Sequence, residues 1–290
     1  MRNILKMEVK KALGNKYFII SLFIGCSLSM LCLIYNAGVY QDYLQLEHYV
    51  LQEADYMINP YHAVFTLFNH WIGGEGYSLG SSLFFFIFPL LTALPYGWSY
   101  CEEKRNGYAR MTVVLAGKKA YFLSKYIAVF FSGALAMTIP LIFSLLSTAM
   151  FFPAVTPVVL YDVHYSVFYQ SLMSSLYYTM PFLYVFLYLV IDFLFGGILG
   201  CISLAACAFI KYKVINVIVP MLLCLGIQWG GRFLYVSTDK AYKEISPLLF
   251  LRGAQTSHKA SWDVILGEFV LFLIITLTVT MIWERKHEIY

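Results

Sequence analysis

The sequence predicts an all-α membrane protein with six transmembrane helices and both termini in the cytoplasm, and three observations lead to this fold class. Hydrophobic residues make up 60% of the 290 residues, and the mean hydropathy is +0.71, which is more apolar surface than an aqueous domain can bury. Several apolar runs reach the roughly 18 to 20 residues that a helix needs to cross a bilayer core. Charged residues are scarce, at 12%, and the basic ones gather in a few short segments.

The first predicted span, residues 17–36, follows a basic amphipathic segment at 1–16 that contains five lysines and arginines. The apolar run is longer than the usual h-region of a signal peptide, and no small-residue cleavage site follows it. We therefore expect this helix to be retained as a transmembrane helix.

The next segments set the orientation of the chain. Residues 37–80 contain acidic residues but no Lys or Arg, so this loop is predicted to be external. The second span, 81–100, then leads into 101–125, which contains six basic residues. Because short cytoplasmic loops carry an excess of Lys and Arg, the segment 101–125 is predicted to lie in the cytoplasm.

Four further spans complete the single predicted transmembrane domain, which covers residues 1–290. The fourth apolar run has 30 residues, so it must tilt or break at Gly196-Gly197. The loop 234–262 is predicted to be external, and its apolar stretch 247–254 could form a re-entrant helix. With this topology 15 of the 20 basic residues are cytoplasmic. The remaining spans are 126–151, 181–210, 214–233 and 264–283.

The sequence lacks the motifs of several enzyme classes. A P-loop is absent, because Thr112 and Lys119 stand where that motif needs Gly and Ser or Thr around Gly117-Lys118. Glu102-Glu103 begins like the EExxxR motif of CAAX-type intramembrane proteases, but Gly107 stands in place of the Arg. HExxH and CxxC motifs are also absent, so we expect no catalytic residues, metal site or bound cofactor in this chain.

The cytoplasmic segment 101–125 contains a predicted short helix. Tyr108, Met111, Val114 and Leu115 recur at helical spacing, and Gly117 is suited to end the helix. The pattern predicts an amphipathic helix over 108–115. A plain connector held at the membrane surface by lipid headgroups is the alternative explanation.

The segment Tyr96 to Phe131 resembles the cytoplasmic region between the second and third spans of ABC-2 type transporter permeases. In that family an acidic residue and a Gly follow span two, a short coupling helix comes next, and a basic residue opens span three. Glu102 or Glu103, Gly107, the helix 108–115 and Lys125 stand at the matching positions. The rest of the chain is similar to the family in hydropathy only.

The resemblance implies a function and a set of partners. The chain would be a permease subunit of an ATP-driven exporter in a bacterial plasma membrane. A separate ABC ATPase subunit would bind ATP and Mg²⁺. A second permease subunit, identical or related, would complete the substrate pathway, and no nucleic acid is involved. The residues implied in contact with the ATPase are Glu102, Glu103, Arg105, Gly107, Tyr108, Arg110, Met111 and Leu115.

A second candidate region lies in the fourth span, where five residues recur at intervals of four. Asp192 is an ionisable residue within an apolar run, which is costly unless it is paired or faces water. Gly196 and Gly200 form a GxxxG pattern that permits close helix packing, either within the chain or between subunits. These residues, a candidate substrate pathway or subunit interface, are Tyr184, Tyr188, Asp192, Gly196 and Gly200.

Two other functions remain open from the sequence. The chain could be a membrane sensor or immunity protein that transports nothing and binds a peptide or lipid outside the cell. It could also be a secondary transporter that uses Asp192 to couple transport to protons. Copurification of an ATPase would favour the exporter, whereas dependence on a proton gradient would favour the secondary transporter.

Overall fold

The computed structural model describes residues 2–53, 64–159, 164–168, 171–235, 243–254 and 258–286, and within these ranges the chain is helical and contains no strand. Five of its helices are long and apolar enough to cross a membrane. The helices are α1 (Arg2–Leu13), α2 (Lys16–Glu53), α3 (Leu67–His70), α4 (Leu79–Ala93), α5 (Ser99–Arg105), α6 (Tyr108–Ala116), α7 (Lys118–Ala149), α8 (Ser174–Thr179), α9 (Pro181–Ala206), α10 (Lys213–Tyr235), α11 (Pro247–Phe250) and α12 (Trp262–Lys286).

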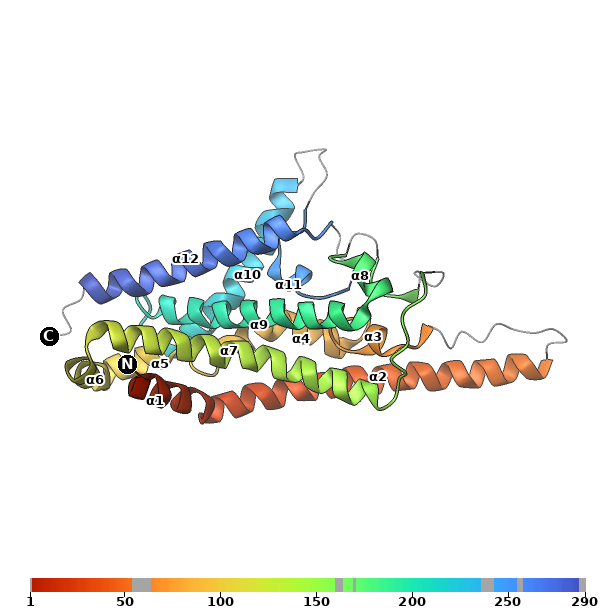
Figure 1. Cartoon of the computed structure of the whole chain (residues 1–290), viewed down its shortest axis with the longest axis horizontal. Helices are drawn as coiled ribbons and strands as arrows, with labels where there is room; N and C mark the ends of the chain where they lie inside the picture. The colour runs from red at the N-terminus through yellow and green to blue at the C-terminus, as the bar shows by residue number, and fades with distance from the viewer. Residues whose placement is uncertain are drawn as a thin grey trace.

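Helices α2, α7, α9 and α12 run side by side along the long axis of the molecule, and α10 is inclined to them (Figure 1). Helix α9 lies at the centre of the bundle and packs on α7, α12, α4 and α10. Helix α7 also packs on α1 and α2. The short helices α1, α5 and α6 gather at one end of the bundle, and the last turns of α12 lie at that end as well (Figure 1). Large apolar side chains remain exposed along α2, α9, α10 and α12, as expected for faces that contact lipid.

Two predictions about the first half of the chain need correction. Helix α2 is continuous from Lys16 to Glu53, so residues 37–53, which were predicted to begin a loop, continue the helix of the first span. Its 38 residues measure about 57 Å at 1.5 Å per residue, well beyond the bilayer core. Helix α2 accordingly extends past its neighbours in Figure 1. Residues 54–63 of the predicted loop lie outside the described part of the chain.

The predicted second span, 81–100, contains one helix and part of another. Helix α4 has 15 residues, about 22 Å, and a series of turns over 94–98 separates it from α5. Helix α4 is nevertheless well packed, against α2, α7, α9 and α10. Its N-terminus is capped by Ser78, whose side chain accepts a hydrogen bond from the Ser81 amide.

The later spans agree with the sequence except at their ends. Helix α7 begins at Lys118, two turns before the predicted start at 126. The prediction followed hydropathy, and these first two turns contain polar residues although they are helical. Helix α9 is unbroken at Gly196-Gly197 and ends at Ala206. In the predicted external loop 234–262, the apolar stretch forms α11 and buries Leu248 and Phe250 among the neighbouring helix ends. Residues 236–242 and 255–257 of that loop lie outside the described residues.

Candidate functional site

The candidate site lies where α1, α5, α6 and α7 meet at one end of the bundle (Figure 1). Two glycines shape the chain there. Gly107, between α5 and α6, has φ +74° and ψ −5°, and Gly117, between α6 and α7, has φ +84° and ψ +146°. Both conformations favour glycine, because a Cβ atom would be strained at these angles. A helix over the predicted residues is confirmed, since α6 spans Tyr108–Ala116.

Helix α6 has one buried and one exposed face. Ala109, Thr112 and Val113 are buried against the rest of the chain. Met111, Val114 and Leu115 are 62%, 83% and 82% exposed, respectively. Three large apolar side chains thus project away from the protein on a helix that is otherwise packed against it. An apolar surface of this kind requires either lipid or a protein partner to cover it.

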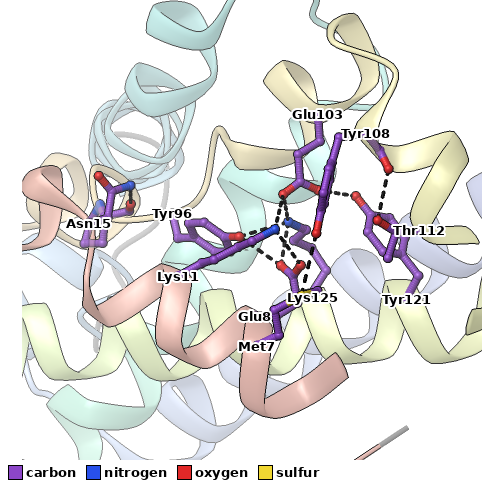
Figure 2. A network of polar contacts seen from close by, with 11 residues as sticks. Met7, Glu8, Lys11, Asn15, Tyr96, Glu103, Tyr108, Thr112, Tyr121 and Lys125 are labelled. Carbon is purple, nitrogen blue, oxygen red and sulfur yellow. Dashed lines mark hydrogen bonds and ion pairs between the residues drawn. The ribbon is translucent and has the colours of Figure 1, made fainter. Parts of the chain in front are cut away.

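Beneath α6 lies a buried group of charges, the ion cluster, which consists of Glu8 and Lys11 from α1, Glu103 from α5 and Lys125 from α7 (Figure 2). Lys125 Nζ lies 2.6 Å from Glu8 Oε2 and 2.7 Å from Glu103 Oε1. The side chains of Lys125 and Glu8 are both 0% exposed. The ammonium of one transmembrane helix is therefore held between carboxylates from two other helices.

Tyrosine hydroxyls add hydrogen bonds to the ion cluster (Figure 2). Lys125 Nζ donates to the Tyr96 hydroxyl at 3.1 Å, which in turn donates to Glu8 Oε2 at 2.9 Å. The Tyr121 hydroxyl donates to Glu103 Oε2. Lys125 thus has three acceptors for its three N–H groups. Full pairing offsets the desolvation cost that a buried ammonium otherwise incurs.

Lys11 links the ion cluster to α6. Its Nζ lies 3.7 Å from Glu8 Oε1, 3.9 Å from Glu103 Oε1 and 3.8 Å from the centroid of the Tyr108 ring. Burial lowers the pKa of Lys11, but its polar contact with Tyr108 and the two carboxylates outweigh burial and raise this pKa above 10.5. Lys11 is therefore charged at neutral pH.

The ion cluster joins three helices, α1, α5 and α7, and α6 contacts it through Tyr108. Helix α1 contributes Glu8 and Lys11, α5 contributes Glu103, and α7 contributes Lys125, while Tyr108 of α6 stacks under Lys11. Removing one partner from a buried pair costs about 3–5 kcal/mol because the other charge stays buried. Separating α1, α5 and α7 at this point would carry a comparable cost, so they are expected to move together.

The other residues predicted to contact an ATPase lie in different surroundings. Glu103 is part of the ion cluster, whereas its neighbour Glu102 lines a separate cleft together with Arg105. Arg110 is exposed on α6. Of the residues in the predicted group, Glu103 and Tyr108 therefore face inward, while Arg110, Met111 and Leu115 face outward.

The five residues predicted in the fourth span lie along the buried part of α9. The rings of Tyr184 and Tyr188 have centroids 4.8 Å apart, and the Tyr184 hydroxyl donates to Gly253 O at 3.2 Å. Asp192 is 1% exposed, and its Oδ1 has no hydrogen-bond partner among the described residues. This carboxyl is a polar group within the apolar interior of the bundle.

The glycines of this stripe pack inside the chain. A Cβ atom on Gly196 would lie 2.9 Å from Met137 Cβ, and one on Gly200 would lie 3.2 Å from Thr92 O. Gly196 therefore permits close approach of α7, and Gly200 permits close approach of α4. Both glycines are buried, and their neighbours show the close packing within one chain that the GxxxG pattern permits.

Sequence reasoning missed four members of the site, Glu8, Lys11, Tyr96 and Tyr121. Glu8 carried a signal, because it is the single acidic residue among residues 1–16, where five residues are basic. An acid retained in a basic amphipathic segment is suited to a buried partner. Tyr96 carried no comparable signal among 24 tyrosines.

Comparison of the chain with protein-family models, with curated proteins and with solved structures found no match.

Proposed function

We propose that this chain is the membrane-spanning permease subunit of an ATP-driven exporter of the ABC-2 type, and that α6 is the coupling helix on which a separate ATPase acts. One observation carries the proposal: α6 exposes Met111, Val114 and Leu115, while the ion cluster behind it fastens α1 and α5 to α7. A helix that is bound from outside and anchored inside is suited to pass a displacement to the membrane-spanning helices.

The placement of the helix ends supports a topology of six spans with both termini in the cytoplasm. Helix α1 and the last turns of α12 lie at the same end of the bundle (Figure 1). Such a chain must cross an even number of times, and five helices are long enough to span. Helix α4 supplies the sixth crossing, extended by the turns at 94–98. The basic residues at the α6 end favour the cytoplasm for that end.

The exposed residues of α6 define the docking surface for the ATPase. The apolar side chains of Met111 and Leu115 provide contact area, and the guanidinium of Arg110 provides a charge that can select orientation. ATP and Mg²⁺ bind in that partner, in keeping with a sequence that has no P-loop. The substrate passes between this chain and a second permease subunit in a bacterial plasma membrane.

The proposal is tested by purifying the tagged chain from its own cell membrane and assaying nucleotide hydrolysis. We expect an ATPase subunit to copurify, and Leu115→Asp to abolish both its capture and the ATP hydrolysis. Leu115→Met, which keeps an apolar side chain of similar size, is the matched control and retains both. Normal capture and hydrolysis with Leu115→Asp would contradict the proposal.

A second candidate function is favoured by Asp192. Its buried carboxyl lacks a hydrogen-bond partner for Oδ1 among the described residues, and such groups in membranes are proton-binding sites in many carriers. If the chain is a proton-coupled transporter, Asp192→Asn abolishes transport driven by a proton gradient, and nucleotide has no effect. If it is the proposed exporter, transport requires ATP in both the wild type and Asp192→Asn.

A further inference from the structure

A cleft of about 420 Å³ opens at the α6 end of the bundle, between α5 and the segment that enters α10. Three basic side chains line it, from Arg105, Lys211 and Lys213, against one acidic side chain, from Glu102. The first turn of α10 also lines the cleft through Val214 and Ile215. Amide N–H groups in the first turn of a helix have no partner within the helix, which adds to the positive character of the cleft.

An apolar groove of about 200 Å³ adjoins this cleft. Lys213 and Val214 line both cavities, so the two lie directly beside each other. Lys213 Nζ lies 5.4 Å from the Trp98 ring, at the point where the charged cleft meets the groove. The remaining residues of the groove are apolar or aromatic: Tyr17, Leu94, Val217 and Ile218.

The wall of the cleft is preformed by hydrogen bonds. The Cys101 thiol donates to Ile210 O at 3.1 Å, and Asn216 Nδ2 donates to the same carbonyl at 3.2 Å. Cys207 Sγ donates to Gly97 O at 3.4 Å, and Ser203 Oγ donates to Asn216 O at 2.8 Å. These hydrogen bonds hold the connection between α9 and α10 against α5 and against the turn that precedes α5. The cleft therefore has its shape before a ligand binds.

Aromatic side chains mark the depth of the cleft in the membrane. Phe209 is 75% exposed and Tyr212 is 71% exposed, both in the connection from α9 to α10. Exposed aromatic residues at the end of a spanning helix are typical of the lipid headgroup level. The cleft therefore lies where headgroups are, and the groove runs from it along the lipid-facing side of α10, where Ile218 is exposed.

We propose that the cleft binds the phosphate headgroup of an anionic phospholipid, one acyl chain of which lies in the adjoining groove. The excess of cations selects a net negative headgroup over a zwitterionic one, and the groove selects a lipid over a free phosphate ester. The bound lipid bridges α5 and α10 at the end of the bundle where α6 lies. This site is separate from the ion cluster, and its existence does not depend on the proposed function.

The test uses the purified full chain and native mass spectrometry, with phosphatidylglycerol, phosphatidylcholine or glycerol phosphate added. We expect phosphatidylglycerol to be retained about tenfold better than phosphatidylcholine, and glycerol phosphate not to displace it. The triple variant Arg105→Gln, Lys211→Gln, Lys213→Gln loses this preference. The matched control, Lys6→Gln, Lys10→Gln, Lys119→Gln, removes three exposed cations at the same end of the bundle and keeps it.

Equal loss in both triple variants would overturn the proposal, because it would mean that only the total charge matters. Displacement by glycerol phosphate would overturn the acyl-chain assignment and leave a free-anion site. If the triple variant misfolds, the test uses the wild-type chain instead, and amide hydrogen exchange is measured in nanodiscs of defined lipid composition. Phosphatidylglycerol must then slow exchange over residues 211–218 relative to phosphatidylcholine, and the absence of slowing contradicts the proposal.

Discussion

The ammonium of Lys125 in α7 lies 2.6 Å from the carboxylate of Glu8 in α1, and neither side chain is exposed. The two residues are 117 positions apart, yet they join the segment that precedes the first spanning helix to the start of another. Glu103 binds the same ammonium from α5. This three-way pairing is the structural basis for treating α1, α5 and α7 as one unit beneath α6.

Replacing Lys125 by Met is expected to destabilise the protein strongly. The change leaves the carboxylates of Glu8 and Glu103 without their shared cation, and breaking a buried pair typically costs about 3–5 kcal/mol. Lys119→Met, at an exposed position on the same helix, is the control and should change stability by less than about 0.5 kcal/mol. The melting temperatures of the two variants in detergent, each compared with that of the wild type, measure these changes in stability. Equal melting temperatures for the two variants would show that the ion cluster contributes nothing.

The two glycines that flank α6 should respond differently to substitution. Gly107 is in the left-handed helical region, which Asn tolerates, so Gly107→Asn costs well under the roughly 1–2 kcal/mol expected for Gly107→Val. Gly117, at φ +84° and ψ +146°, is near a region used almost exclusively by glycine, so Gly117→Asn costs about 1–3 kcal/mol. Neither site has a steric clash, since a Cβ atom on either would meet nothing within 4 Å.

Melting temperatures of Gly107→Asn, Gly107→Val and Gly117→Asn, measured side by side, test whether Gly107→Asn is the most stable of the three. If Gly117→Asn were as stable as Gly107→Asn, the backbone conformation assigned to Gly117 would be wrong.

Cys101 should react with alkylating reagents at an unusually low pH. The side-chain contact with Cys207 lowers the pKa of Cys101 most, burial raises it, and Asn216 and the charges of Lys104 and Arg105 lower it further, to about 7. The thiolate therefore forms as pH rises through about 7, whereas an ordinary thiol needs about 8.5. Iodoacetamide labelling between pH 6 and 9, with the site read by peptide mass spectrometry, measures the apparent pKa.

Arg105→Gln is the companion variant for Cys101, because it removes one of the charges that lower the pKa. Its labelling curve should shift to higher pH, while Lys119→Gln should leave the curve unchanged. Wild-type labelling that begins to rise only above pH 8.5 would contradict the assignment.

Much of the fold could be predicted from sequence, because apolar runs of bilayer length are a local property. Five of the six predicted spans correspond to long helices. The helix α6 was also within reach, since Tyr108, Met111 and Leu115 recur at helical spacing and Gly117 ends the run. The ends of helices were predicted less well. Hydropathy marks where apolar residues begin, so it placed the start of α7 at 126 although the polar turn from Lys118 is helical.

The ion cluster could not be predicted, because its pairs depend on how distant helices pack. Glu103 and Lys125 both attracted attention in the sequence, but nothing local indicates that they meet each other or Glu8. Likewise the GxxxG pattern of Gly196 and Gly200 is compatible with packing inside the chain or between chains. The neighbours Met137 and Thr92 show that it is used within one chain.

We propose that an ATPase covers the exposed face of α6, and crosslinking from position 115 will show what lies against that face. A photoreactive benzoylphenylalanine replaces Leu115 in one variant and Met150, which is 84% exposed after the end of α7, in the other. We expect irradiation in cells to join position 115, and not position 150, to a polypeptide that binds and hydrolyses ATP. Crosslinks from position 115 to lipid alone would contradict it.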